Sequence, residues 1–315
     1  MNRYTGININ SDTAICYSGY RDGQNPGTET YPSYEQVKED LLMLQGRWKY
    51  LRLYDCTEHA EIVLEVIRKE KLDFQVMLSA YIIAEVSNHD CPWGGGVYSE
   101  EQLAINKQKN IDEVNRLIKL ANEYPAIAFC LSVGNEATVD WTDHLVPVER
   151  VIEYVRMVKK SAKQPVTFCE NYVPWLNKLL PLAEELDFIS IHTYPVWEYK
   201  NIHEALEYTK QNYYSVADKY PHKPVMITEA GWATNSNGRG IHPENVNEEL
   251  QEMYYHQLAD WCKEDGIITF VFEAFDENWK GSPDALEPEK HWGLFKADRT
   301  PKKVMKPFYP SLIEG

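Results

Sequence analysis

The sequence predicts a single (β/α)8 barrel, an α/β fold in which one domain covers residues 1–315. Two observations favour this fold: eight short strand-like runs alternate with helical patterns, and no linker separates them. Strand–helix alternation implies parallel strands, and eight such units in one chain are typical of a closed barrel. An open doubly wound sheet is the alternative, but no G-x-G-x-x-G follows the first predicted strand and no Walker sequence occurs.

The predicted strands are short apolar or alternating runs that glycine, proline or polar residues interrupt. The run at 225–228 shows the pattern clearly, because Pro224 marks its start and Gly231 follows its end. Such a run is typical of a strand that is buried on both faces. The predicted strands are residues 4–10, 50–54, 74–78, 127–133, 166–168, 188–191, 225–228 and 267–272.

The predicted helices carry apolar residues at spacings of three and four, which place these residues on one face. Thr57 is a candidate N-cap, Ser99 with Gln102 forms a candidate capping box, and Pro243 suits a first turn. The predicted helices are residues 34–44, a segment after Thr57, a long segment after Ser99, 148–161, 174–183, 202–219 and a segment from Pro243.

The charge and composition of the chain limit its partners. A net charge of −16 argues against nucleic acid and anionic membranes, because phosphate binding needs basic patches. No signal peptide and no apolar run of ~18 residues is visible, which predicts a cytoplasmic protein, or a secreted or periplasmic one if a leader has been removed. The six cysteines are widely spaced without a C-x-x-C pair, and we interpret them as reduced core residues.

Two glutamates stand where predicted buried strands end. Glu136 follows the strand at 127–133, and Glu229 follows the strand at 225–228. Either glutamate alone is equally consistent with a structural role, because a carboxylate can neutralise an arginine or cap a helix. Their joint occurrence at the C-terminal ends of two barrel strands favours an active site. Two carboxylates can cleave a glycosidic bond, one as nucleophile and one as acid and then base.

Other polar and aromatic side chains also follow the predicted strands. This mixture suits carbohydrate, whose flat C–H faces pack on rings and whose hydroxyls bind amides, carboxylates and lysine. We interpret Arg52 and Asp55 as a structural ion pair, and His192 as either a barrel residue or a site residue. Sugar binding implies no metal, and His89 with Cys91 are too few ligands for a zinc site. The side chains at the strand ends are Arg52, Tyr54, Asp55, Asn135, Glu170, Asn171, Tyr172, His192, Tyr194, Trp232, Glu273, Asp276, Glu277, Trp279 and Lys280.

Six motifs resemble those of glycoside hydrolase family 17, and the bacterial and fungal members more than the plant members. Together they extend over nearly the whole chain, and their order makes the resemblance highly specific. The motifs are R-L-Y-D at 52–55, V-G-N-E at 133–136, C-E-N-Y-V-P-W at 169–175, I-T-E-A-G-W at 227–232, F-D-E-N-W-K-G at 275–281 and H-W-G-L-F at 291–295.

The resemblance implies a retaining hydrolase of β-1,3-glucan that needs no cofactor. Carried over to this chain, it makes Glu136 the acid/base and Glu229 the nucleophile, with their carboxyl groups roughly 5–5.5 Å apart. Asn135 would hold the sugar 2-hydroxyl, and Tyr194 would donate to Glu229 and keep it ionised. The implied subsite residues are Tyr54, Asn171, Tyr172, Trp232, Glu277, Trp279, Lys280 and Glu289.

Two other functions stay open on the sequence. A transglucosylase would pass the glucosyl unit to another sugar, and a catalytically silent barrel would bind β-glucan without cleaving it. The presence of both glutamates argues against the silent barrel. Three long loops, at 18–32, 81–98 and 278–290, indicate a cleft that is closed at one end. Such a cleft favours cleavage at the ends of glucan chains or cleavage of short oligosaccharides.

Overall fold

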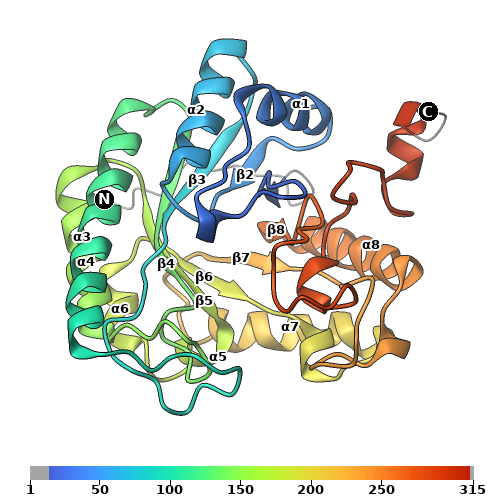
Figure 1. Ribbon diagram of the computed structural model, residues 1–315. Coiled ribbons are helices and arrows are strands. Elements are labelled where there is room, and N and C mark those ends of the chain that lie inside the picture. The colour runs from blue at the N-terminus through green and yellow to red at the C-terminus, as the bar shows by residue number, and fades with distance from the viewer. Residues whose placement is uncertain (1–13, 313–315) are drawn as a thin grey trace.

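Eight parallel strands form a closed barrel in the order β1 to β8, each paired with its neighbours in sequence and β8 paired with β1. The computed structural model describes residues 14–312. Figure 1 shows the strands at the centre and the helices outside them, so the predicted (β/α)8 barrel is confirmed. The strands are β1 (Ala14–Cys16), β2 (Tyr50–Arg52), β3 (Gln75–Ala80), β4 (Ala128–Asn135), β5 (Val166–Asn171), β6 (Ile189–His192), β7 (Val225–Ala230) and β8 (Thr269–Val271).

The observed strands agree with the predicted ones except at the start of the chain. The strand predicted at 4–10 lies outside the described residues, and the first barrel strand is the fully buried run Ala14–Cys16. A run of three apolar residues is too short to show a period, so this run was not predicted as a barrel strand. β4 and β5 extend beyond their predicted ends as far as Asn135 and Asn171, which places two predicted site residues within strands.

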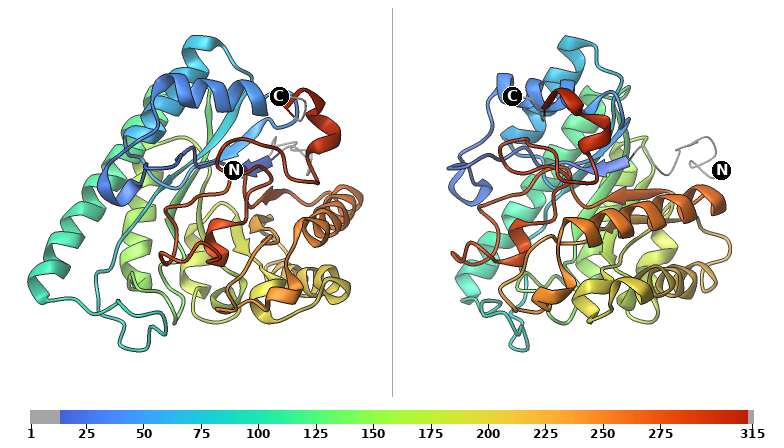
Figure 2. Two further views of the ribbon diagram at one scale, coloured as in Figure 1. Left: turned by 45° about the vertical axis from the view of Figure 1, so that its right-hand side comes forward. Right: turned by 90° about the vertical axis from the view of Figure 1, so that its right-hand side faces the viewer.

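The helices cover the outside of the barrel, as the two views in Figure 2 show. The helix predicted at 174–183 is two short helices. The helix start predicted at Pro243 is wrong: Pro243 begins a separate 3₁₀ helix, and after the extended Val246 the α-helix begins at Glu248. The helices are α1 (Tyr34–Leu44), α2 (Glu58–Glu70), α3 (Glu100–Glu123), α4 (Val148–Ser161), α5 (Tyr172–Trp175), α6 (Leu180–Glu185), α7 (Ile202–Ala217) and α8 (Glu248–Asp265). The 3₁₀ helices are η1 (Pro26–Thr28), η2 (Pro195–Glu198), η3 (Pro243–Asn245), η4 (Pro288–Lys290), η5 (Lys306–Phe308) and η6 (Pro310–Leu312).

The predicted helix caps are only partly formed. The Ser99 side chain accepts from the Gln102 backbone N–H at 3.1 Å, but the Gln102 amide donates to Asn106 instead of returning to Ser99. Thr57 is the N-cap residue of α2, yet its hydroxyl donates to Asp55 and makes no cap hydrogen bond. The starts of α2 and α3 are therefore predicted correctly, while the hydrogen-bond partners of their caps are set by neighbouring side chains.

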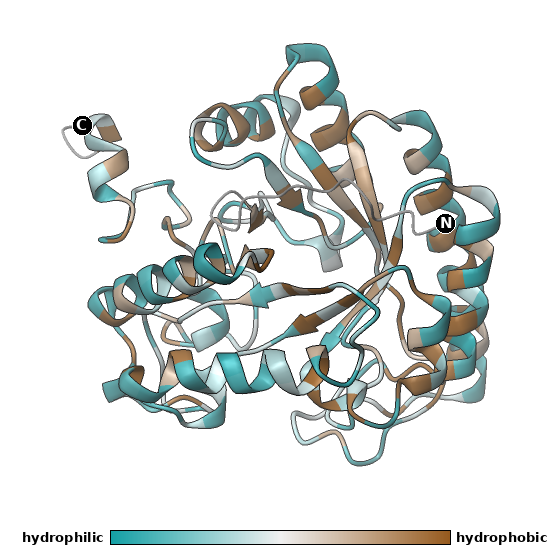
Figure 3. Ribbon diagram, turned by 180° about the vertical axis from the view of Figure 1, so that it is seen from behind, coloured by the Kyte–Doolittle hydropathy of each residue, from teal (hydrophilic) through white to brown (hydrophobic). Residues whose placement is uncertain are grey.

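The core lies between the barrel and the inner faces of the helices. Figure 3 shows apolar residues along the strands and on one side of the helices. All six cysteines are free, and five of them are buried, which agrees with their interpretation as reduced core residues. Within residues 14–312, no helix is both long and apolar enough to cross a membrane. The strands thus form a rigid frame whose C-terminal ends carry the loops and the site.

Candidate active site

An irregular end of β4 aims Glu136 at the centre of the barrel. Gly134 has φ +104°, and a Cβ there would lie 2.7 Å from the Phe168 ring and 2.9 Å from Ile82, so only glycine fits. The register with β5 also shifts between Ser132 and Asn135. Glu136 itself has φ 47°, in the left-handed region that a non-glycine residue rarely adopts. Such local strain is typical of functional positions.

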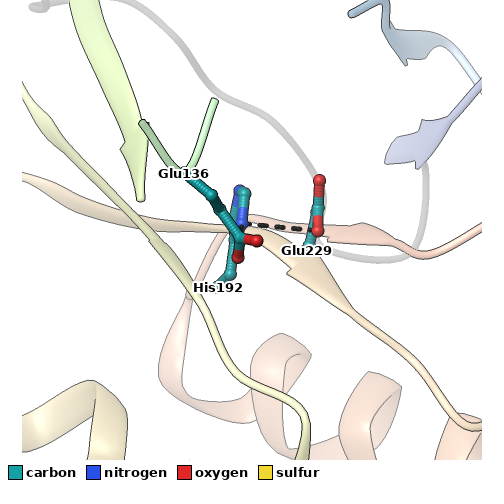
Figure 4. A group of neighbouring side chains, drawn as sticks. All are labelled: Glu136, His192 and Glu229. Atoms are coloured by element: carbon teal, nitrogen blue, oxygen red, sulfur yellow. Dashed lines mark hydrogen bonds and ion pairs between the residues drawn. The ribbon is translucent and has the colours of Figure 1, made fainter. Parts of the chain in front are cut away.

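Glu229 is the penultimate residue of β7, which is three strands along the barrel from β4. It is a register partner of His192 on β6, and only 5% of its surface is exposed. Figure 4 shows Glu136, His192 and Glu229 pointing toward one another from β4, β6 and β7. A carboxylate oxygen of Glu136, a ring nitrogen of His192 and a carboxylate oxygen of Glu229 all lie within 4.8 Å of one another. The two glutamates predicted to act together are therefore adjacent.

Four side chains surround the carboxylate of Glu229: those of Arg52, Tyr54, Tyr194 and His192. Arg52 on β2 forms a buried ion pair with it, Tyr54 donates to Oε1 at 3.0 Å, and Tyr194 donates to Oε2 at 2.5 Å. Burial disfavours the charge, but the cations of His192 and Arg52 outweigh it and lower the pKa of Glu229 to about 2. Glu229 is thus ionised at neutral pH, as a nucleophile must be.

The expected ion pair between Arg52 and Asp55 is wrong. Arg52 points inward, where it binds Glu229 and donates to Asn135 Oδ1 at 2.6 Å. Asp55 lies beyond the strand end and accepts from the backbone N–H and the hydroxyl of Thr57. The alternation of a strand explains this difference, because residues 52 and 54 share the inner face whereas 55 does not. The contact with Arg52 also orients the Asn135 amide, leaving its NH₂ group to donate to a ligand.

His192 bridges the two glutamates through one nitrogen. Its Nδ1 lies 2.8 Å from Glu136 Oε1 and 3.3 Å from Glu229 Oε2. Burial opposes protonation, but the two carboxylates and the neighbouring Cys169 raise the pKa of His192 to about 10. The imidazole is therefore a cation at neutral pH. Because protonated Nδ1 cannot ligate a metal, this cluster is better suited to proton transfer than to metal binding.

A cleft of about 1240 Å³ opens above these residues. Nine of the ten predicted substrate-binding residues line this cleft. The predicted residues that line the cleft with Glu136 and Glu229 are Tyr54, Asn135, Asn171, Tyr172, Tyr194, Glu277, Trp279, Lys280 and Glu289. Carboxylates, amides and rings thus surround a space that is large enough for several sugar units.

Trp232 is the exception, and its predicted place in a sugar subsite is not supported by the structure. The chain turns at Gly231, and the Trp232 ring is buried against Tyr254 of α8, with ring centres 5.3 Å apart. Its indole N–H donates to the Asn245 carbonyl at 2.9 Å. Trp292, from the H-W-G-L-F motif, lines the cleft instead and packs on Tyr194 at 4.9 Å between ring centres.

Lys280 joins two buried carboxylates at the edge of the cleft. Its Nζ lies 2.8 Å from Glu273 Oε2 and 2.5 Å from Glu277 Oε2. Burial raises the pKa of Glu273, whereas for Glu277 the charge of Lys280 outweighs burial and lowers the pKa. Glu277 also accepts from the Trp279 indole at 2.9 Å. Burial raises the pKa of nearby Glu289 to about 7, so this rim offers both donors and acceptors to sugar hydroxyls.

Several cleft residues carry no pattern that sequence reasoning could use. They lie on loops or, for Trp197, in a short 3₁₀ helix, where neither a helical nor a strand period applies. Trp292 had a signal because it belongs to a quoted motif, as do the lining residues Asp55, Val173 and Gly281. The further lining residues include Tyr20, Tyr31, Tyr81, Trp93, Trp141, His144, Trp197, Tyr199 and Arg239.

Known proteins resemble this chain in both sequence and fold. The BtgE/BtgC glycoside hydrolase domain model matches residues 14–293. A putative glucan endo-1,3-beta-glucosidase btgC of Aspergillus niger is 26% identical over 299 residues, covering 87% of this chain and 40% of that protein. The cell surface mannoprotein MP65 of Candida albicans is 21% identical, covering 92% of this chain and 68% of that protein. The chain thus spans about 40% of the length of the btgC relative.

Two solved structures share the barrel. An endo-laminarinase from Formosa Hel1_33_131 has a TM-score of 0.80 and 27% identity, covering 97% of this chain and 88% of that chain. A glycoside hydrolase family 17 beta-1,3-glucanosyltransferase from Rhizomucor miehei has a TM-score of 0.72 and 22% identity, covering 93% and 96%. The family model covers most of this chain, in agreement with the family 17 resemblance of its motifs. This chain therefore belongs to the BtgE/BtgC glycoside hydrolase domain family.

Proposed function

We propose that this chain hydrolyses β-1,3-glucosidic bonds of β-glucan with retention of configuration, with Glu229 as nucleophile and Glu136 as acid/base. The observation that carries the proposal is the approach of their carboxylate oxygens to within 4.8 Å at the floor of the cleft. Retaining glycosidases hold their carboxyl groups about 5–5.5 Å apart, whereas inverting ones leave about 6.5–9.5 Å for a water molecule. The close pair favours the retaining mechanism.

In the first step, ionised Glu229 attacks the anomeric carbon and the glycosidic C–O bond breaks. Glu136 gives its proton to the leaving oxygen, so the departing sugar leaves as a neutral alcohol. The Nδ1–H of His192, 2.8 Å from Glu136 Oε1, keeps a second proton within one hydrogen bond of that carboxyl. Asn135 donates to the sugar 2-hydroxyl, a contact that strengthens as positive charge develops on the ring.

In the second step, water replaces the leaving sugar. Glu136, now a carboxylate, removes a proton from the water, whose oxygen attacks the anomeric carbon and releases Glu229. Two inversions give net retention. If a sugar hydroxyl takes the place of water, the same step lengthens the chain and makes the enzyme a transglucosylase.

The choice of β-1,3-glucan rests on the relatives together with the lining of the cleft. The names of the Aspergillus relative and of the Formosa structure refer to β-1,3-glucan or laminarin. The cleft offers Trp279, Tyr172 and Trp292 as rings for sugar faces, and Lys280 with Glu277 for hydroxyls. Acidic side chains outnumber basic ones in the lining of the cleft, which also favours a neutral glucan over a phosphorylated or sulfated sugar.

Laminaripentaose tests the proposal. We expect cleavage to shorter oligosaccharides, with the β-anomer of the new reducing end appearing first by NMR. Glu229→Gln should abolish turnover, while Glu101→Gln, a matched change on the exposed side of α3, should leave it unchanged. Initial release of the α-anomer would remove Glu229 as nucleophile. Products longer than the substrate would indicate transfer, and binding without cleavage would indicate a silent barrel.

A further inference from the structure

A contact between Trp93 and Arg239 joins loops from two sides of the barrel. The Arg239 guanidinium carbon lies 5.1 Å from the centre of the Trp93 ring. Trp93 belongs to the loop between β3 and α3, and Arg239 to the loop between β7 and α8. In the closed order of strands, β4 to β6 lie on one side of this pair and β8, β1 and β2 on the other. The contact, which we name the Trp93–Arg239 bridge, therefore links loops that follow two strands far apart in the barrel order.

The loop that carries Trp93 is held firmly against the loop after β4. The Asn88 amide donates to the carbonyls of Asp140 and Thr142, each at 2.8 Å, and the Tyr98 hydroxyl donates to the Asp143 carbonyl at 2.8 Å. Residues 94–96 are three glycines with φ between +77° and +87°, a turn that other residues adopt only with strain. This turn follows Trp93 directly, so the conformation of the three glycines helps to set the direction of the Trp93 indole.

The loop that carries Arg239 is equally well supported. Arg239 pairs with Glu287 at 3.1 Å, and the buried Glu287 carboxylate also accepts from the Ser282 hydroxyl at 2.7 Å. Next to it, Gly240 lies so close to the Trp197 ring that a Cβ would approach within 2.2 Å. Arg239 is thus fixed to the loop after β8 on one side and to the Trp93 ring on the other.

Both residues of the bridge line the same cleft as the catalytic pair. On the β8–β2 side the cleft is lined by Tyr20 and Trp279, and on the β4–β6 side by Tyr172. Because the two residues line the cleft and contact each other, the bridge closes one path by which a glucan could leave the cleft. The middle of a long glucan needs two such paths, whereas a chain end needs only one.

We propose that the Trp93–Arg239 bridge determines chain-length specificity, selecting short oligosaccharides and free chain ends over internal bonds of long β-glucan. This inference rests on the proposed glucan hydrolysis. Trp93 and Arg239 act as specificity residues, because they shape the path of the substrate and touch neither reacting carboxylate. The bridge is also exposed, with 51% of Trp93 accessible, so a single substitution can open it without removing a core residue.

The test compares internal cleavage with total cleavage of a long linear β-1,3-glucan. We would measure the fall in viscosity per reducing end released by the wild type, Trp93→Ala, Arg239→Ala and Trp93→Phe. We expect a small fall in viscosity per reducing end for the wild type. For both alanine variants we expect this fall to be about two- to fivefold larger, a factor that corresponds to the energy of an exposed cation–π contact. Trp93→Phe keeps a ring under the guanidinium and should remain close to the wild type.

Arg68→Ala is the matched control, because it removes an exposed arginine that lies 4.6 Å from the Tyr124 ring, outside the cleft. An unchanged ratio in both alanine variants would overturn the inference. The inference would also be overturned if the wild type lowered the viscosity of the glucan as steeply as an enzyme that cuts at random positions. This second outcome does not depend on the variants, so it can be obtained even if a variant fails to fold. Failure of the wild type to cleave laminaripentaose would instead contradict the proposed function, so the two failures are distinguishable.

Discussion

His192 Nδ1 lies 2.8 Å from Glu136 Oε1, so a buried cation on β6 contacts the proposed acid/base on β4. The same nitrogen lies 3.3 Å from Glu229 on β7. One imidazole thus contacts the carboxyl groups of both glutamates and lowers the pKa of Glu229. A free pair of carboxylates at this separation would repel each other, and the cation between them relieves that repulsion.

Replacing His192 should therefore change the pH profile as well as the rate. In His192→Gln the cation that lowers the pKa of Glu229 is lost, so this pKa rises and the nucleophile becomes protonated at higher pH. We expect the acidic limb of kcat/KM to move to higher pH and kcat to fall by about 10²-fold or more. Profiles on laminaripentaose measure both. His203→Gln, on the exposed face of α7, is the control, and an unmoved acidic limb would contradict the proposed role.

The same cluster should make stability depend on pH. The pKa of His192 is raised from 6.5 to about 10 on folding, so its stabilising effect is complete below pH 6.5 and is lost as the pH rises toward 10. The pKa of Glu229 is lowered from 4.5 to about 2, so its contribution is complete above pH 4.5 and is lost toward pH 2. Urea unfolding at pH 6 and pH 10 should show a loss of stability in the wild type. The loss should be smaller in His192→Gln; equal losses would count against a protonated His192.

Trp279 and Trp232 should respond differently to truncation. Trp279 lines the cleft, and Trp279→Ala should raise KM while changing the unfolding free energy by less than about 1 kcal/mol. Trp232 is packed on Tyr254, and Trp232→Ala should cost about 3–5 kcal/mol through the cavity it leaves. Urea denaturation and oligosaccharide kinetics separate the two effects. A rise in KM for Trp232→Ala without loss of stability would restore Trp232 to the sugar site.

Gly134 should be intolerant of a side chain. In Gly134→Ala the new Cβ meets the Phe168 ring and Ile82, and the positive φ adds about 1 kcal/mol of strain. The strand end should shift and misplace Glu136, lowering kcat by about tenfold or more. Gly266→Ala is the matched control, because Gly266 also has a positive φ but nothing within 4 Å of the added Cβ. Similar losses of activity in both variants would show that strain alone, and not the displacement of Glu136, is responsible.

The strand pattern was sufficient to place most of the barrel and both glutamates. Buried parallel strands are continuous apolar runs, and a polar residue that interrupts the run marks the C-terminal end where barrel sites lie. The errors fall where that rule has no information. β1 is a three-residue run, and the direction of Trp232 depends on how the chain turns at Gly231, which no period describes.

The sequence by itself determined the fold class, the two glutamates and the family resemblance, because each depends on local periods or on contiguous motifs. Only the tertiary structure decided that Arg52 forms its ion pair with Glu229 instead of Asp55, and that His192 lies between the two glutamates. It also decided that Trp292 lines the cleft whereas Trp232 does not, and that Trp93 contacts Arg239 at the cleft. The physical reason is barrel closure, which brings together side chains from strands and loops that are far apart in the chain.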